Sequence, residues 1–267
     1  MKFNEDYTEY WMGAVKRSID GSVIPGSEVA DSFLKYLAID KNHKILDLGC
    51  SFGRMFDVLS KFSDEVYGLD PDPFAINEAS KHSYKVLVEG YSEEIFFDDD
   101  FFDHIFVWAT FDAVGQNKTL CELNRVLKIS GRFLLSGKND KYFENDLLAF
   151  AAEKAAFLKR FPNKFSNLKN ILINAEFFGF EIEHLFIFDK RGDFGLNKFR
   201  EAPIDKNRDY VGYEYLLIGR KIRSILPTEE LMEILLSSPI SQNVQELVEK
   251  SHYKEVEEFF NSSENLD

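Results

Sequence analysis

Short apolar runs alternate with segments of helical periodicity over most of the chain. The apolar runs predict seven strands, at residues 44–48, 66–70, 85–88, 104–110, 129–139, 180–188 and 213–221. Apolar residues recur every three or four positions in the helical segments, which are residues 27–38, 54–59, 74–80, 117–128 and 166–178. Helices that alternate with buried strands predict an α/β fold with a doubly wound sheet.

Breaks in this pattern divide the chain into a central domain, residues 27–226, and two appended segments. The N-terminal segment, 1–26, is predicted to form a helix whose aromatic face either packs on the domain or closes over a site as a lid. The acidic C-terminal extension, 227–267, is predicted to be helical and to pack on its own domain or on a second subunit. Within the domain, residues 138–165 and 189–213 interrupt the pattern and are predicted to be insertions that contact the substrate.

Charge and cysteine content narrow the range of partners and compartments. The net charge is −14, and residues 228–267 hold ten Asp and Glu side chains against two Lys. The rest of the chain is only mildly acidic and offers no basic stripe for a phosphate backbone, which argues against nucleic acid. The two cysteines form no disulfide framework, and no apolar stretch approaches the ~20 residues of a membrane span. We therefore expect a soluble cytoplasmic protein, either a monomer or a homodimer through its C-terminal extension, without membrane association.

The stretch 44–54, KILDLGCSFGR, carries the strongest chemical signal. A buried strand containing Asp47 ends in a glycine-rich turn that opens a helix, and glycine lets a ligand lie close to the backbone. The spacing from Gly49 to Gly53 is G-x-x-x-G, which differs from the G-x-G-x-x-G of dinucleotide-binding folds. Asp70 ends the next strand, where a carboxylate can accept both hydroxyls of a ribose. The alternative is a structural turn in which Asp70 caps the following helix.

The form D-x-G-x-x-x-G resembles the first motif of class I S-adenosylmethionine-dependent methyltransferases, with Ser51 at the usual middle glycine. The run RVLKISGRFLLSG, residues 125–137, resembles a later segment of this family, and small-molecule methyltransferase domains of type 11 are similar. The resemblance implies a Rossmann-like sheet of six parallel strands and one antiparallel strand. It implies S-adenosyl-L-methionine as cofactor and S-adenosyl-L-homocysteine as product. Cofactor contacts are implied for Asp47, Gly49, Cys50, Ser51, Gly53, Asp70, Pro71, Tyr91, Ser92, Glu93 and Trp108.

The loop after the third strand differs from the family pattern. In the resembling family this loop carries a polar side chain to the adenine amine, often an Asp after the Gly. Tyr91 stands at that point here, so the role is expected to pass to Glu93 or to the backbone at Ser92.

The acceptor is expected at the carboxyl ends of the strands. Asp112, just after the fourth strand, is the candidate general base, and Tyr10, Trp11, Lys138 and Arg191 are candidate substrate contacts. The resemblance implies O-methylation of a small acceptor in a bacterial sugar, capsule or surface-polysaccharide pathway. The second insertion is either a solvated loop of mixed charge or a substrate loop. In the second case its basic residues fit a phosphorylated or phosphoramidate-bearing acceptor, because a planar guanidinium matches such groups.

Other functions remain open at this stage. N-methylation of a small molecule would need less help from a base. A nucleotide-dependent oxidoreductase would use the same strand, turn and helix, although the glycine spacing counts against it. A non-catalytic cofactor-binding protein could act on a partner through the acidic extension.

The acidic run Asp98–Asp100 suggests either a metal site or a solvated turn. Consecutive carboxylates repel one another unless an ion holds them, so the solvated turn is favoured. No convincing set of His, Asp and Asn residues has the spacing of metal ligands, and we predict a metal-independent reaction.

Overall fold

The structure is a computed structural model that describes residues 27–142, 146–158, 163–225 and 241–243. The predicted N-terminal helix lies outside these residues, as do all but three residues of the C-terminal extension. The strands of the main sheet are β1 (Lys44–Leu48), β2 (Glu65–Asp70), β3 (Val86–Glu89), β4 (Phe102–Val107), β5 (Leu127–Lys138), β7 (Phe180–Phe188), β8 (Arg200–Ala202) and β9 (Glu214–Lys221). The described helices are α2 (Ser27–Leu34), α3 (Phe56–Leu59), α4 (Pro73–Ala79), α5 (Gln116–Val126), α6 (Leu147–Leu158) and α7 (Leu168–Asn174).

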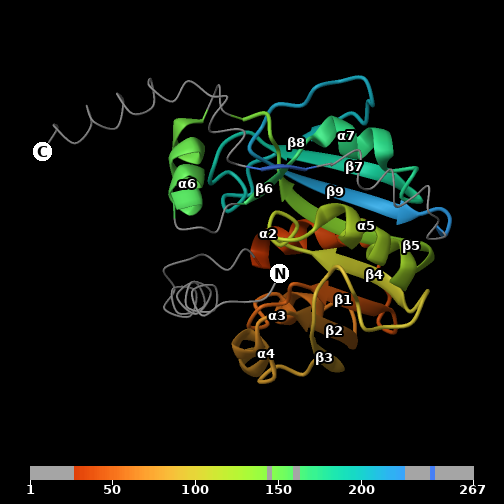
Figure 1. Ribbon diagram of the computed structural model, residues 1–267. Coiled ribbons are helices and arrows are strands. Elements are labelled where there is room, and N and C mark those ends of the chain that lie inside the picture. The colour runs from red at the N-terminus through yellow and green to blue at the C-terminus, as the bar shows by residue number, and fades with distance from the viewer. Residues whose placement is uncertain (1–26, 143–145, 159–162, 226–240, 244–267) are drawn as a thin grey trace, which may run out of the picture.

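The main sheet has eight strands in the order β3-β2-β1-β4-β5-β9-β7-β8 (Figure 1). Strands β3, β2, β1, β4 and β5 run parallel, β9 runs antiparallel to both neighbours, and β7 therefore has the direction of the first five. The predicted six parallel strands and one antiparallel strand are confirmed. The three-residue edge strand β8, antiparallel to β7, is an addition that lies within the second predicted insertion.

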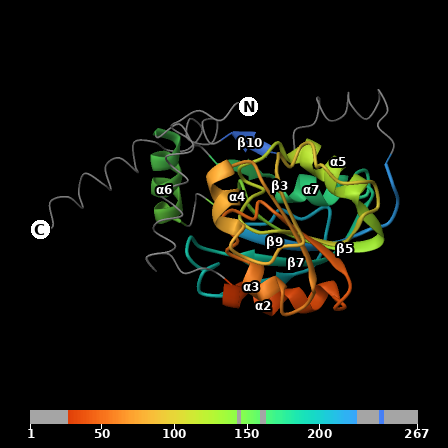
Figure 2. The ribbon, with the colours of Figure 1, turned by 90° about the horizontal axis from the view of Figure 1, so that it is seen from below.

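Alternating side chains of the central strands belong to two apolar clusters, one on each face of the sheet. In β1, Leu46 and Leu48 belong to one cluster and Ile45 belongs to the other, as the period of two requires. Helices α5 and α7 pack on the first cluster, and α2 and α3 pack on the second (Figure 2). The apolar runs of the sequence are continuous because both faces of these strands are buried.

Several predicted helix boundaries differ from those observed. The segment after Arg54 forms turns and only the short helix α3, where a continuous helix was expected. The helix predicted to begin at 166 begins two residues later, because Ser166 ends a strand and the Asn167 side chain accepts the capping hydrogen bond from the N–H of Asn170. The start of α4 agrees with the sequence: the Asp72 side chain caps it and Pro73 occupies its first turn.

A second, two-stranded sheet joins the first insertion to the C-terminal extension. Its strands are β6 (Lys164–Ser166) and β10 (Ser241–Asn243), which pair antiparallel. Residue Ser166 also bridges to Asn139, directly after β5, so this small sheet adjoins the carboxyl edge of the main one. Helix α6 also stands at that edge (Figure 1). Residues 241–243 thus form a strand within an extension that was predicted to be helical, and this strand pairs with its own chain.

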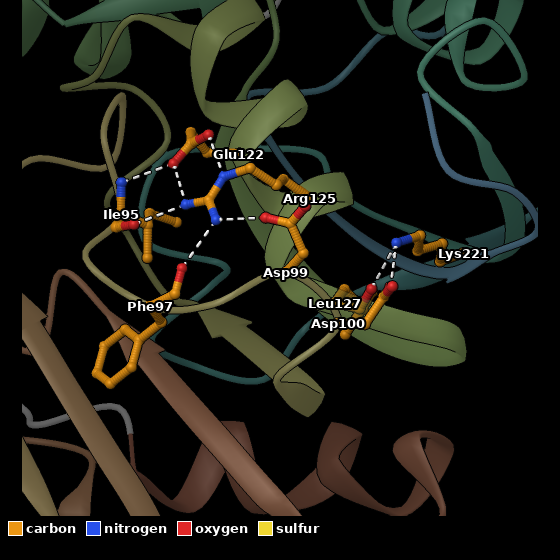
Figure 3. A network of polar contacts seen from close by, with 8 residues as sticks. All are labelled: Ile95, Phe97, Asp99, Asp100, Glu122, Arg125, Leu127 and Lys221. Atoms are coloured by element: carbon orange, nitrogen blue, oxygen red, sulfur yellow. Dashed lines mark hydrogen bonds and ion pairs between the residues drawn. The ribbon is translucent and has the colours of Figure 1, made fainter. Parts of the chain in front are cut away.

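The acidic turn lies at the opposite, amino-terminal edge of the sheet and is held by two cations (Figure 3). Asp99 forms an ion pair with Arg125 at 2.9 Å, and Asp100 pairs with the buried Lys221 at 2.6 Å. Asp98, Asp99 and Asp100 are exposed, which agrees with the predicted solvated turn. Among the described residues no group of three His, Cys, Asp or Glu side chains is arranged to hold a metal ion. No described helix combines the length and apolar character that a membrane span requires.

Candidate cofactor and acceptor site

Three residues of the turn after β1 have left-handed backbone conformations. The φ angles are +76° at Gly49, +50° at Ser51 and +85° at Gly53. The turn is tied to β2, because the N–H groups of Gly49 and Cys50 donate to the carbonyl of Leu69 at 2.8 and 3.1 Å. Ser51 therefore adopts the conformation that glycine takes readily at the position where the sequence pattern usually has glycine.

The Asp70 carboxylate lies at the end of β2 against this turn. The N–H of Ser51 donates to Oδ2 and the N–H of Asp72 donates to Oδ1, both at 2.9 Å. Burial raises the pKa of Asp70 to about 6, although the two backbone hydrogen bonds oppose the increase. Each carboxylate oxygen has one backbone donor and keeps capacity for a further one, so Asp70 can still accept two ligand hydroxyls.

Asp47 lies deeper, within β1 and beside the turn. Its carboxylate accepts a hydrogen bond from the hydroxyl of Tyr84 at 2.8 Å, and burial raises its pKa to about 7. The positive charge of Arg54 opposes that increase. The Cys50 side chain is buried against Gly68 of β2, so only its backbone faces the turn. Tyr84 and Arg54 were missed by sequence reasoning, because neither belongs to the D-x-G-x-x-x-G pattern.

The loop after β3 joins the candidate adenine region to the start of α5. The Glu93 carboxylate accepts hydrogen bonds from the N–H of Gly115, at 2.6 Å, and from the hydroxyl of Ser92, at 2.9 Å. Ser92 is buried and also contacts the Thr119 hydroxyl at 2.9 Å, whereas Tyr91 is exposed. The Glu93 carboxylate is already hydrogen-bonded to Gly115 at the N-terminus of α5. The backbone at Ser92 is therefore the better of the two predicted adenine contacts.

Residues just after β4 connect the glycine turn to the acceptor side. Trp108 is buried in the second apolar cluster and stacks on Phe106 with ring centroids 5.5 Å apart. Ala109 has a φ of +52°, and its N–H donates to the Ser136 hydroxyl at 2.7 Å. The Thr110 side chain lies directly over Gly49. This sharp change of direction brings the segment that ends at Asp112 next to the turn.

Asp112 and Lys138 meet at the carboxyl edge, as their positions after β4 and at the end of β5 allow. The Lys138 Nζ lies 3.2 Å from Asp112 Oδ2 and 3.0 Å from Glu153 Oε1, a buried carboxylate on α6. Glu153 also accepts hydrogen bonds from the hydroxyl of Tyr213 and, at 2.6 Å, from the side-chain amide of Asn163. Although burial favours the neutral amine, these carboxylates raise the pKa of Lys138 above its ordinary value.

Glu214 completes this group of charges from the first position of β9. It pairs in register with Lys138 across the antiparallel strands β5 and β9. Burial raises the pKa of Glu214 to about 7. Lys138 and Arg191 oppose the increase, whereas Asp112 and Glu153 add to it. We call Asp112, Lys138, Glu153 and Glu214 the edge cluster.

The edge cluster contains two of the predicted acceptor-side residues, Asp112 and Lys138, and a third, Arg191, acts electrostatically on its member Glu214. Arg191 is exposed, and its N–H donates to the Asp146 carboxylate. Glu153 and Glu214 were missed by sequence reasoning. An acid at the start of the antiparallel strand was the available signal for Glu214, because that position lies at the edge where parallel strands end. The predicted contacts Tyr10 and Trp11 lie outside the described residues.

Comparisons with known proteins agree with this geometry. Residues 46–135 match the family model described as a methyltransferase domain. Over these residues the chain is similar to methyltransferase domains. The match covers most of β1, the strands β2 to β4 and most of β5, and therefore the glycine turn, Asp70 and the segment after β4.

The chain is also similar to individual methyltransferases. It is 30% identical over 123 residues to the uncharacterized methyltransferase YcgJ of Bacillus subtilis, and the match covers 43% of this chain and 49% of YcgJ. The chain thus spans about half the length of this curated relative. A methyltransferase from Thermotoga maritima, described as a possible histamine N-methyltransferase, has a TM-score of 0.60 at 14% identity, covering 82% of this chain and 98% of that one. A chain of the Haloferax volcanii complex that contains the Trm112 methyltransferase activator also has a TM-score of 0.60, at 15% identity, covering 84% of this chain and 100% of that one. At these identities the two structures support the fold alone.

Proposed function

We propose that this protein transfers the methyl group of S-adenosylmethionine to a small acceptor. The observation that carries the proposal is the hydrogen bonding of the Asp70 carboxylate. Each of its oxygens accepts one hydrogen bond from a backbone N–H and can accept a second one from a ribose hydroxyl. The left-handed turn from Gly49 to Gly53 beside it leaves room for the nucleoside against the backbone.

The chain's own residues fit this cofactor in distinct roles. Asp70 accepts the ribose hydroxyls, and the backbone at Ser92 serves the adenine. Asp47, held by Tyr84, supplies negative charge beside the turn for the cofactor's amino-acid end. When bound, the cofactor supplies a methyl group on a cationic sulfonium that leaves as a neutral thioether. The protein's remaining task is to position the acceptor in line with that methyl group and to exclude water.

O-methylation of a phosphorylated or phosphoramidate-bearing acceptor stays a prediction, and the charges around the site give it limited support. In the second insertion, Arg200 pairs with Asp189 at 3.0 Å and Lys198 pairs with Asp193 at 3.5 Å. These basic side chains are therefore not free to clamp an anion. The acidic balance of the edge cluster is the specific observation that favours N-methylation of a small amine as the second candidate.

Isothermal titration calorimetry with S-adenosylmethionine and S-adenosylhomocysteine tests the proposal. We expect micromolar binding that Asp70→Ala weakens about 10- to 100-fold, because charge-assisted hydrogen bonds are lost. Asp64→Ala, which removes an exposed carboxylate near the other end of β2, is the matched control and should bind normally. Absence of binding by folded wild-type protein would refute the proposal, and tighter binding of NADH would favour an oxidoreductase.

A further inference from the structure

We propose that the methyl acceptor is an amine and that Glu214 binds its ammonium form and receives its proton. This inference rests on the proposed methyl transfer and goes beyond it by naming the acceptor's chemical class and a new catalytic residue. It is argued from the edge cluster, whose four members come from four different elements.

The positions of these elements align the acceptor with the cofactor turn. The adjacent strands β1, β4, β5 and β9 carry, in this order, the glycine turn, Asp112, Lys138 and Glu214 at one edge of the sheet. Glu214 belongs to this edge because β9 runs antiparallel and begins where its neighbours end. Thr110, packed on Gly49, links the turn to Asp112 two residues later. The cofactor turn and the cluster therefore lie along the same edge of the sheet.

The cation inside the cluster is already neutralised by protein groups. Lys138 is largely buried, and its ammonium group forms ion pairs with both Asp112 and Glu153. Glu153 in turn is fully engaged by Lys138, Tyr213 and Asn163. Lys138 is thus a positioning residue that holds two carboxylates in place, and it offers little positive charge to an anionic acceptor.

Glu214 is the carboxylate that this arrangement leaves available. It is half-buried, and within the described part of the chain its carboxylate accepts no hydrogen bond and forms no ion pair. The charged groups that face it are Lys138 from β5, Asp112 after β4, Glu153 from α6 and Arg191 after β7. Three carboxylates, including Glu214 itself, against Lys138 and the exposed Arg191 leave this edge of the sheet acidic, which suits an ammonium group.

The proposed step balances in charge and protons. The ammonium first gives one proton to the Glu214 carboxylate, which produces the neutral amine. The nitrogen lone pair then forms the N–C bond to the methyl carbon while the C–S bond breaks and its electron pair stays on sulfur. Glu214 releases the proton to water. A carboxylate with a pKa of about 7 is a stronger base than an ordinary Glu, which aids the first transfer.

Binding to the full-length protein saturated with S-adenosylhomocysteine tests the acceptor class without turnover. Ligand-observed NMR compares amine and alcohol pairs of equal shape, such as phenethylamine against phenethyl alcohol and butylamine against butanol. We expect the amines to bind at least about tenfold more tightly at pH 7.5, and Glu214→Gln to abolish the preference. Glu201→Gln, on the outer strand β8, should retain it. Equal binding of amines and alcohols, or no binding of either, would overturn the inference.

Methyl transfer from labelled cofactor to a panel of amines and alcohols tests the role of Glu214 as a base. We expect the wild-type kcat/KM for amines to rise with pH through about 7, and Glu214→Gln to lose this rise with at least about a hundredfold decrease. Calorimetry with S-adenosylhomocysteine is run on every variant. If the wild-type protein does not bind S-adenosylhomocysteine, the proposed methyltransferase function is refuted. If it binds the cofactor but methylates only oxygen acceptors, only the assignment of an amine acceptor is refuted.

Discussion

Thr110 packs so closely on Gly49 that a methyl group added to Gly49 would lie 2.3 Å from the Thr110 hydroxyl oxygen. Gly49 also has a left-handed φ of +76°, which L side chains rarely adopt. We therefore expect Gly49→Ala to destabilise the protein by about 2–3 kcal/mol and to weaken cofactor binding, because both the clash and the backbone conformation oppose the new side chain. Urea denaturation and calorimetry measure the two effects.

A matched double variant separates these two causes. Thr110→Ala removes the atoms that the new methyl group meets, so Gly49→Ala with Thr110→Ala should recover part of the lost stability. The remaining deficit, about 1 kcal/mol, reflects the left-handed backbone. Full recovery, or none, would show that only one of the two causes operates.

The pKa of Asp70 predicts how cofactor binding depends on pH. The ionised carboxylate accepts the ribose hydroxyls, and its pKa is raised to about 6. Affinity for S-adenosylhomocysteine should therefore fall about tenfold per pH unit below pH 6, as protonation of Asp70 removes an acceptor. Asp70→Asn should bind weakly with no such dependence. Calorimetry from pH 5 to 8 tests this, and an affinity that increases on acidification would contradict it.

Removing Lys138 should destabilise the protein in a pH-dependent manner. Its pKa is raised in the folded state, so its contribution is present below about pH 10.5 and is lost only as pH rises through the higher folded value. Lys138→Met leaves Asp112 and Glu153 facing each other without a cation. We expect a loss of about 3–5 kcal/mol at pH 8 and less at pH 5, where the carboxylates of the variant can take up protons.

Guanidinium denaturation at both pH values measures the Lys138→Met effect. Lys128→Met is the control, because Lys128 forms a more exposed ion pair with Asp103 at the other edge of the sheet. That variant should lose no more than about 1 kcal/mol at either pH. Equal losses for the two variants would mean that the edge cluster has no special electrostatic role.

Arg125 should be important for stability and unimportant for the site. Its guanidinium donates to the Glu122 and Asp99 carboxylates and to the carbonyls of Ile95 and Phe97 (Figure 3). Lysine cannot satisfy all these acceptors at once, so Arg125→Lys is expected to cost about 2 kcal/mol. Cofactor affinity should remain within about twofold, because the network lies at the opposite edge from Asp70.

Arg223→Lys provides the comparison for Arg125, since Arg223 is exposed and, among the described residues, its guanidinium donates to two carbonyls, those of Glu176 and Phe177. Its effect on stability should be the smaller one in thermal and chemical denaturation. A large decrease in cofactor affinity for Arg125→Lys would contradict the separation of the two edges.

The sequence predicted the parts of the fold that depend on local periodicity. Strands such as β1 and β4 are buried on both faces, so their apolar runs are continuous and easily recognised. Strands β6, β8 and β10 were not predicted. Each has three residues and exists because of a partner distant in sequence, which no local pattern reveals.

The candidate site likewise has a part that the sequence predicted and a part that it did not. The cofactor side was predicted from one motif, because the turn from Gly49 to Gly53 and Asp70 are close both in sequence and in space. The edge cluster depends on the register of β5 with β9 and on the position of α6, both of which are tertiary features. Asp112 and Lys138 could be named from their places after strands, whereas Glu153 sits in an insertion helix whose docking the sequence does not specify.

The strand β10 has a practical consequence for anyone who shortens this protein. Cutting the chain before Ser241 would uncover the hydrogen-bonding edge of β6, and unpaired strand edges recruit other chains. The same β6 residues support the site, because the N–H of Lys164 donates to the carbonyl of Asp112 and Ser166 bonds the buried hydroxyl of Tyr215. Precipitation of such a truncated protein would then reflect an exposed β-edge rather than the loss of a regulatory segment, and a boundary placed beyond Asn243 keeps this edge paired.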